Sequence, residues 1–301
     1  HGQIFVSGST ITTKDKPYDK VVGGVAIGSG SSFEAAGSEG KVTITGGYIE
    51  AYGTFGNGIG GGNSSNSTGG KATISISGGT VIASSIGGGD SKSGTGGSAN
   101  VEVSGTAHIT LEKGVGGGSS LSGNGGAATI TVSGGTLYAN GSIGGGEGGG
   151  TGNGGDATVN IYGGNLTSAS IGGGTGSVGG HGGAAIVEVT DGFIETGSIG
   201  GGKTNNPNGN LGYAKATISG GDISGQFLMA AGGTEPCTFT ITGGTLHGVD
   251  TADTSKFNYA QQNGAAVYMD DPNGVVSISG GTIKDCSAVN GGAIYMSDGT
   301  C

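Results

Sequence analysis

Along most of the chain, apolar residues occupy every second position of short segments that are interrupted by glycine. Residues 41–51 read KVTITGGYIEA, residues 73–83 read TISISGGTVIA and residues 129–139 read TITVSGGTLYA. On both sides of the Gly-Gly doublet, valine, isoleucine or leucine alternates with more polar residues. An alternation with a period of two, rich in β-branched residues, is typical of strands with one buried face. No long stretch has the apolar spacing of a helix, so the sequence predicts an all-β protein.

The strand pairs recur at a regular interval. Further copies, one of them with a degenerate doublet, begin at Asn100, Thr158, Ile186, Lys215, Thr238 and Val275. A second landmark, Ile or Val followed by three glycines, begins at Ile59, Ile86, Val115, Ile143, Ile171 and Ile199. Two strands, a glycine corner and a polar glycine-rich loop describe one coil of a parallel β-solenoid. We therefore predict a parallel β-helix, right-handed by the general preference of β-helices, with about nine or ten coils of ~28 residues.

The repeats organise the chain as a single solenoid domain over residues 1–301. We expect residues 1–40 to form an irregular N-terminal coil and residues 41–236 to form the regular glycine-rich coils. Residues 237–301 are expected to form variant coils, because NGAAVYMDDPNG and NGGAIYMSDGT replace the triple-glycine landmark there. The chain opens and closes within the pattern, so the solenoid is expected to continue beyond this segment.

The composition and charge of the chain exclude several classes of protein. Glycine supplies 78 of the 301 residues, but its regular spacing and a charged content of only 11% argue against a disordered chain. The net charge is −10 and every basic residue is a lysine. A nucleic-acid partner is therefore excluded, because binding to a phosphate backbone needs a basic patch. No apolar run approaches the roughly 20 residues of a membrane span, and residues 1–10 do not resemble a signal peptide.

The three cysteines, Cys237, Cys286 and Cys301, lie in the last quarter of the chain. They are too few for a disulfide framework, and no pair has the spacing of a zinc site. Two interpretations stay open for them. Cys286 and Cys301 form a disulfide if the protein is secreted, or all three are small buried thiols.

Two short motifs superficially resemble those of polygalacturonases, which are parallel β-helix enzymes. They are GHG at residues 180–182 and the pair Asp270–Asp271. In that family the aspartates precede the histidine and an arginine follows, whereas here the order is reversed and arginine is absent. No histidine has a triad-like partner in sequence, although an acid–base pair formed between coils stays open.

The glycine loops do not predict a ligand site either. They lack the helix that would receive a phosphate. The aspartate of the calcium-binding nonapeptide occurs in only one of the coils. We therefore predict no catalytic residue, no cofactor and no metal.

Large aromatic side chains at outward strand positions are the best candidates for contact with another molecule. They are Tyr48, Tyr138, Tyr162 and Phe193, and glutamates occupy similar positions. Aromatic faces with polar neighbours suit stacking on sugar rings. The alternative is that these side chains cover exposed glycine backbone or contact a neighbouring chain.

The segments ITVSGGTLYANGSIGGG and ISGGTIKDCSAVNGGAIYM resemble repeats of large, glycine-rich, adhesin-like surface proteins of Gram-positive gut bacteria. The resemblance extends over roughly residues 40–300 and implies an extracellular location, secreted or attached to the cell surface. It further implies a stalk or adhesive solenoid, with self-association into filaments or bundles and host or matrix glycans as the expected partners.

We accordingly expect a non-enzymatic structural solenoid that forms a stiff stalk or filament segment. Because a fold alone does not fix a function, three alternatives remain. A carbohydrate-binding module would use the outward aromatic side chains in a groove. A polysaccharide-active enzyme would bring two carboxylates together in a cleft. A phage tail spike or fibre would form a stable trimer.

Overall fold

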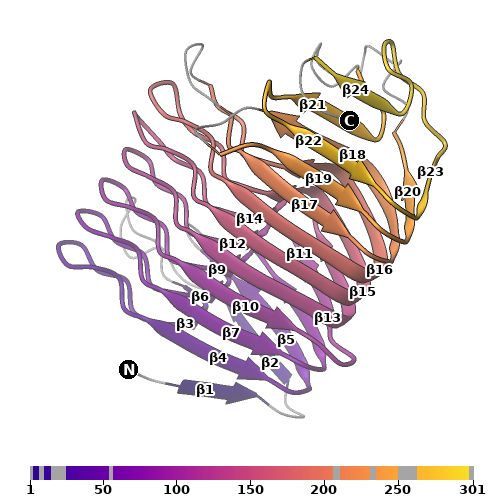
Figure 1. Ribbon diagram of the computed structural model, residues 1–301. Helices are drawn as coiled ribbons and strands as arrows, with labels where there is room; N and C mark the ends of the chain where they lie inside the picture. The colour runs from indigo at the N-terminus through magenta and orange to yellow at the C-terminus, as the bar shows by residue number, and fades with distance from the viewer. Residues whose placement is uncertain are drawn as a thin grey trace.

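The computed structural model describes residues 3–6, 10–14, 25–53, 57–205, 211–230, 235–249 and 263–297. These residues form strands and turns, and none of them is helical. The described part of the chain therefore offers no helix that could cross a membrane. Successive coils stack from the N-terminal end to the C-terminal end (Figure 1), and every ladder between them is parallel. The predicted all-β parallel solenoid is confirmed.

Each coil contributes strands to three faces. The first face precedes the Gly-Gly doublet, and its strands are β1 (Gln3–Val6), β4 (Gly40–Ile44), β7 (Ala72–Ile76), β10 (Ala99–Val103), β17 (Ala214–Ile218), β19 (Thr238–Ile241) and β22 (Val275–Ile278). The second face follows the doublet, and its strands are β2 (Thr10–Lys14), β5 (Tyr48–Tyr52), β8 (Thr80–Ala83), β11 (His108–Leu111), β20 (Thr245–His247) and β23 (Thr282–Lys284).

The third face contains β3 (Ile27–Gly28), β6 (Ile59–Gly60), β9 (Ile86–Gly87), β12 (Val115–Gly116), β14 (Ser142–Gly144), β21 (Val267–Asp270) and β24 (Ile294–Met296). Longer strands pass around corners and serve two or three faces: β13 (Ala128–Ala139), β15 (Ala157–Gly172), β16 (Ala185–Gly200) and β18 (Asp222–Ala230). The solenoid has about eight turns, slightly fewer than the nine or ten expected.

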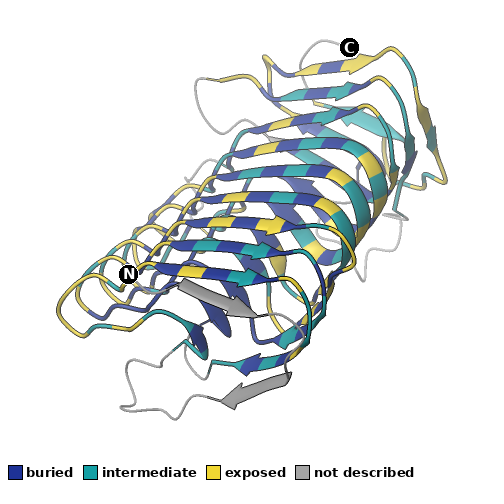
Figure 2. Ribbon diagram, turned by 90° about the horizontal axis from the view of Figure 1, so that it is seen from below, coloured by how far each residue is buried: buried dark blue, intermediate teal, exposed yellow. Residues whose placement is uncertain are grey.

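The core consists of rows of inward side chains that repeat from coil to coil. One row on the first face is fully buried, with an exposed fraction of 0% for Ile44, Ile76, Val103, Val132, Ile161, Val189, Ile218 and Ile241. Burial alternates along the strands, as the bands in Figure 2 show. Since one coil cannot bury its own apolar residues, stacking of the coils creates the core.

The triple-glycine landmark marks the corner of the third face, where the backbones of successive coils approach closely. Six glycines there have φ between 140° and 159°: Gly60, Gly87, Gly116, Gly144, Gly172 and Gly200. A Cβ atom on any of them would lie 1.7–2.0 Å from a carbonyl oxygen of the next coil. Glycine is therefore required here both by the backbone angle and by the lack of space.

The glycine-rich loops between the third face and the next first-face strand stack into a thin projection, which we call the glycine fin (Figure 1). It comprises residues 61–71, 88–98, 117–127, 145–156 and 173–184. Backbone hydrogen bonds join the two sides of a loop to each other. For example, the N–H of Gly97 donates to the carbonyl oxygen of Gly89 at 2.8 Å. Gly118 of the next coil then donates to Gly97, also at 2.8 Å. Hydrogen bonds between backbone groups, within and between loops, therefore hold the fin together.

A row of serines joins the fin loops near their tips: Ser32, Ser64, Ser91 and Ser120. In one of them, Ser91, Oγ accepts the N–H of Gly94 at 2.8 Å and donates to the carbonyl of Ser67 at 2.6 Å. The hydroxyl therefore closes its own turn and also bonds the preceding coil. Through these two hydrogen bonds the serine holds its loop in register with the preceding loop.

Replacing Ser91 with alanine should lower the free energy of unfolding by about 1 kcal/mol, because it leaves two partly buried backbone groups, the N–H of Gly94 and the carbonyl of Ser67, without this partner. Ser122 is exposed in the neighbouring loop, so Ser122→Ala provides a matched control with an expected effect within about 0.5 kcal/mol. Urea unfolding of the two variants measures the difference. Equal stabilities would show that the serine row contributes nothing to the fin.

Candidate functional site

The four predicted contact residues all lie on the outside of the solenoid. The exposed fractions are 38% for Tyr48, 43% for Tyr138, 44% for Tyr162 and 50% for Phe193. Tyr48 donates its hydroxyl proton to Glu50 Oε1 at 2.5 Å. This hydrogen bond, followed by desolvation and the negative charge of Glu50, raises the pKa of the Tyr48 hydroxyl above its ordinary value.

The structure spreads these aromatic side chains over several rows. Tyr48 and Phe193 occupy the same row of the second face, but Thr80, His108, Thr136 and Asn165 lie between them. Five coil spacings of about 4.8 Å place them roughly 24 Å apart. Tyr138 lies in a different row, and Tyr162 lies at the corner between the first and second faces. A role in ligand binding or in chain contact remains a prediction for each of them.

The described surface is hollowed where the third face meets the glycine fin. A groove of about 480 Å³ is lined by glycine backbone together with Asp90, Lys113, Ser142 and Glu147. Two of these four side chains, those of Asp90 and Ser142, form hydrogen bonds to the next coil. Asp90 Oδ1 accepts the N–H of Ser119 at 2.8 Å. Burial nevertheless raises the pKa of the Asp90 carboxyl. None of the four aromatic candidates lines this groove.

The residues of the polygalacturonase-like motifs lie on different coils. His181 belongs to the loop after β15, where its N–H donates to Asn153 Oδ1 at 2.9 Å. Asp271 follows β21 and is buried, with an exposed fraction of 3%. Its Oδ2 accepts the N–H of Cys237 at 2.7 Å, and its Oδ1 accepts that of Asn273 at 2.9 Å. Asp271 thus has an identifiable structural task.

The two described cysteines are both free thiols, and they differ in burial: Cys237 is buried, as one interpretation expected, whereas Cys286 is only partly buried. Cys237 is buried, and desolvation raises the pKa of its thiol to about 11. Cys286 donates its S–H to the carbonyl of Lys284 at 3.2 Å, and burial also raises the pKa of this thiol. Raised pKa values disfavour the reactive thiolate. Cys301, the predicted disulfide partner of Cys286, lies outside the described residues.

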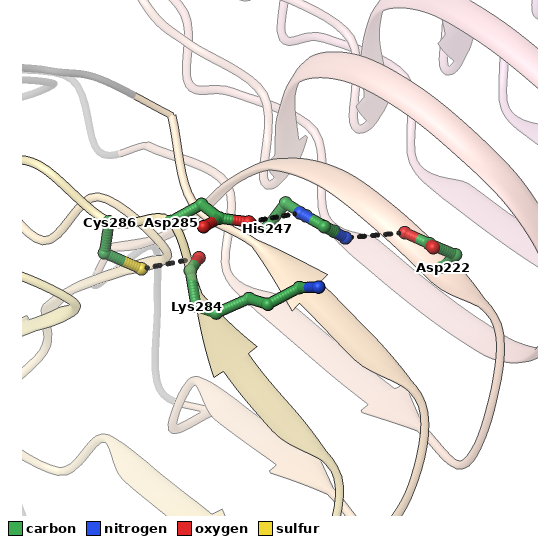
Figure 3. Close-up of polar contacts among 5 residues, drawn as sticks. All are labelled: Asp222, His247, Lys284, Asp285 and Cys286. Carbon is green, nitrogen blue, oxygen red and sulfur yellow. Dashed lines mark hydrogen bonds and ion pairs between the residues drawn. The ribbon is translucent and has the colours of Figure 1, made fainter.

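A charged cluster that sequence analysis missed joins the three C-terminal coils (Figure 3). Asp222 begins β18, His247 ends β20 and Asp285 follows β23. His247 Nε2 lies 3.0 Å from Asp222 Oδ1, and His247 Nδ1 lies 2.8 Å from Asp285 Oδ2. The exposed fractions of these side chains are 27% for His247, 52% for Asp222 and 65% for Asp285. The imidazole ring therefore bridges two carboxylates from different coils.

The chemistry of this cluster is that of an ion bridge. Both ring nitrogens face carboxylate oxygens, so neither is directed at a substrate. In the described part of the chain the polar partners of the His247 ring are Asp222 and Asp285, and no group of three or more acidic, histidine or cysteine side chains is arranged to hold a metal ion. The cluster lacks the nucleophile–base contact of a hydrolytic triad.

The signal for this cluster was present in the alignment of the doublets. The segments GGDISG, GGTLHG and GGTIKD place His247 in the same row as Ser224 and Lys284, a register that the structure shows. Asp222 is two residues before Ser224, and Asp285 is next to Lys284. A comparison of equivalent positions in successive repeats would therefore have predicted that these three side chains lie close together.

Comparison of the chain with known proteins identifies no family for it. No protein-family model matches the chain, and no curated protein or solved structure matches it significantly. The function is therefore inferred from the chain's own residues and from their arrangement in the solenoid.

Proposed function

We propose that this protein is a non-enzymatic structural solenoid that forms a stiff stalk or filament segment outside a bacterial cell. The observation that carries the proposal is the continuity of hydrogen bonding along the solenoid axis. Parallel ladders join successive coils on all three faces, and the glycine fin adds a fourth line of backbone bonds. Because these ladders join each coil to the next along the whole described solenoid, bending the rod requires many bonds to be strained together.

The use of polar side chains supports a structural role. Several carboxamide, carboxylate and hydroxyl groups that would otherwise be candidates for binding are engaged in bonds between coils. Asn124 and Asn153 form one such pair, since the N–H of Asn153 donates to Asn124 Oδ1 at 2.9 Å. Ser142 and Ser170 form another, with their hydroxyl oxygens 2.7 Å apart. The extracellular location follows from the resemblance of the repeats to adhesin-like surface proteins.

The C-terminal coil supports assembly from end to end. Ile278 of β22 occupies the same inward row as Ile241, yet its exposed fraction is 49%, against 0% for Ile241. In the described residues β22 pairs with β19 alone. An unpaired strand edge beside exposed apolar side chains favours the addition of another strand. Where the added strand comes from a second copy, head-to-tail contacts of this kind build filaments, because the interface does not close on itself; where it comes from a further coil of the same chain, it lengthens the rod.

We expect negative-stain electron microscopy of the purified protein, combined with a measurement of its mass in solution, to show rods that associate lengthwise. Ile278→Lys should shorten the assemblies, because it places a charge at the junction. Val178→Lys is the matched control, since Val178 is also exposed, at 66%, but lies in the fin. Discrete monomeric rods for the unaltered protein would refute assembly. Retention on glycans that is lost in Tyr138→Ala would instead identify a carbohydrate-binding module.

A further inference from the structure

The groove between the third face and the glycine fin extends beyond the part described above. A second hollow, of about 210 Å³, shares the lining residues Ser142, Gly145 and Glu147 with it. The two hollows, which we call the axial groove, follow the third face from Ile86 of β9 to Leu228 of β18. Five coil spacings of about 4.8 Å give the axial groove a length of roughly 24 Å. This shape suits an extended chain that lies along the solenoid axis.

One wall of the axial groove is a row of backbone groups at the base of the fin. Equivalent places in successive coils are occupied by Asn63, Asp90, Ser119, Glu147, Thr175 and Lys203. In the first half of this row the N–H groups are occupied by side chains of the preceding coil. The N–H of Asp90 donates to Asn63 Oδ1 and that of Ser119 donates to Asp90 Oδ1, both at 2.8 Å. This half of the wall is therefore closed to a ligand.

The same N–H groups are open in the second half of the row. Those of Glu147, Thr175 and Lys203 form no hydrogen bond with any described residue, although the carbonyl oxygens of all three accept one. The asparagine and aspartate that cap the earlier N–H groups have no counterpart in these coils. Three backbone donors thus line the wall at the coil spacing of about 4.8 Å.

The opposite wall is a row of serine hydroxyl groups, one from each coil. Ser142, Ser170 and Ser198 are in register, and the hydroxyl oxygens of the first two lie 2.7 Å apart. Ser198 is buried, with an exposed fraction of 9%, and it lines the axial groove. Its hydroxyl has no hydrogen-bond partner among the described residues. Because burying an unpaired hydroxyl is unfavourable, this group points to a ligand that supplies the missing bond.

The charges around the open half favour an uncharged ligand with many hydroxyl groups. Glu147 and Lys203 are exposed, carry opposite charges and form no ion pair with a described residue. A polyanion would gain little here and would also be repelled by the net charge of −10. The walls offer donors, from the backbone, and acceptors, from Glu147 and the serines. A hydroxyl group can bond to both kinds, because it donates and accepts.

The spacing of the coils distinguishes a glycan from a peptide. An extended peptide presents groups on one side at every second residue, about 6.6 Å apart, which is out of step with the coils. Specific binding of a peptide also needs pockets for its side chains, whereas glycine backbone lines much of the axial groove. A linear chain of β-linked pyranose rings advances by nearly one coil spacing for each ring, and every ring carries hydroxyl groups.

We propose that the axial groove binds an uncharged linear glycan, which lies along the solenoid axis beside Glu147, Thr175, Lys203 and Ser198. The three backbone N–H groups donate to oxygen atoms of successive rings, and the Ser198 hydroxyl and the Glu147 carboxylate bond to ring hydroxyl groups. The site is separate from the four outward aromatic side chains, none of which lines the axial groove. It is also independent of end-to-end assembly, because it lies in the middle of one chain.

Calorimetric titration and hydrogen exchange with defined oligosaccharides test the site. The neutral probes are cellohexaose, mannohexaose and xylohexaose, with hexagalacturonic acid as the charged probe and a glycine–serine hexapeptide as the peptide probe. At least one neutral probe should bind and should slow exchange of the amides of Glu147, Thr175 and Lys203. Exchange at Asp90 and Ser119, whose N–H groups are already bonded, should stay unchanged.

The double variant Glu147→Asn, Thr175→Asn should close the open half with the chain's own capping device. The new carboxamides would accept the N–H groups of Thr175 and Lys203, as Asn63 accepts that of Asp90. Loss of one or two hydrogen bonds to the glycan should lower its affinity about fivefold to thirtyfold. Ser198→Ala should also weaken binding without lowering stability, because it removes an unpaired hydroxyl.

Thr110→Asn is the matched control, since it makes the same kind of change at an exposed position of β11, and it should keep full affinity. Tyr138→Ala should keep it as well. The proposal is overturned if no neutral probe binds, if the double variant binds as tightly as the unaltered protein, or if the charged probe or the peptide protects these amides instead. Electron microscopy of the same samples tests assembly separately, so failure of one proposal is distinguishable from failure of the other.

Discussion

Gly144→Ala is expected to disrupt the solenoid in its middle, with a loss of about 4 kcal/mol or more. The added Cβ atom would lie 1.7 Å from the carbonyl oxygen of Gly172, which is part of the backbone of the next coil. Gly144 also has a φ of 151°, which an alanine adopts only with strain. Because Gly116 and Gly172 are stacked on either side of it, the backbone cannot move away without breaking the ladder between them.

The effect is measured by urea unfolding together with hydrogen exchange of β14 and the third-face part of β15. Gly30→Ala is the matched control, since a Cβ atom at Gly30 would meet no other atom within 4 Å. It should leave stability nearly unchanged. A stable Gly144→Ala protein with normal protection at β14 would show that the triple-glycine corner has room for a methyl group.

Phe239→Ala should have the second largest effect, with a loss of about 3–5 kcal/mol, as is typical when a buried phenylalanine leaves a cavity. Phe239 is fully buried and packs edge-on against Phe227, with ring centroids 4.9 Å apart and an angle of 63° between the rings. Its row contains the small side chain of Ala216 in the preceding coil. The surrounding coils are hydrogen-bonded in fixed register, so they can fill the cavity only in part.

Phe193→Ala removes the same side chain from the outside of the solenoid, where it is half exposed, and should change stability by about 0.5 kcal/mol or less. Both variants are best compared by hydrogen exchange along the chain, because stacked repeats need not unfold in one step. The loss in Phe239→Ala should be concentrated in β17–β22. Equal losses for the two variants would contradict the described core.

The alternation of apolar residues was sufficient to predict the fold. It places Ile44, Ile76 and Val103 in one inward row, and the structure shows these residues in register and fully buried. The Gly-Gly doublets locate the corners, because few other residues adopt the positive φ found at Gly79 and Gly135. The outward positions of Tyr48 and Phe193 follow from the same period of two. The number of turns is about eight, slightly fewer than the nine or ten predicted.

The sequence by itself therefore determined the all-β repeat, its period and the direction of each side chain, because these depend on residues close together in the chain. Only the tertiary structure decided which side chains meet. It showed that the fin glycines pack backbone against backbone, and that the outward aromatic side chains are spread over several rows. It also brought His247 between Asp222 and Asp285, at unequal sequence separations. Contacts between coils depend on the length and path of every intervening loop, and stacking of the whole chain fixes these together.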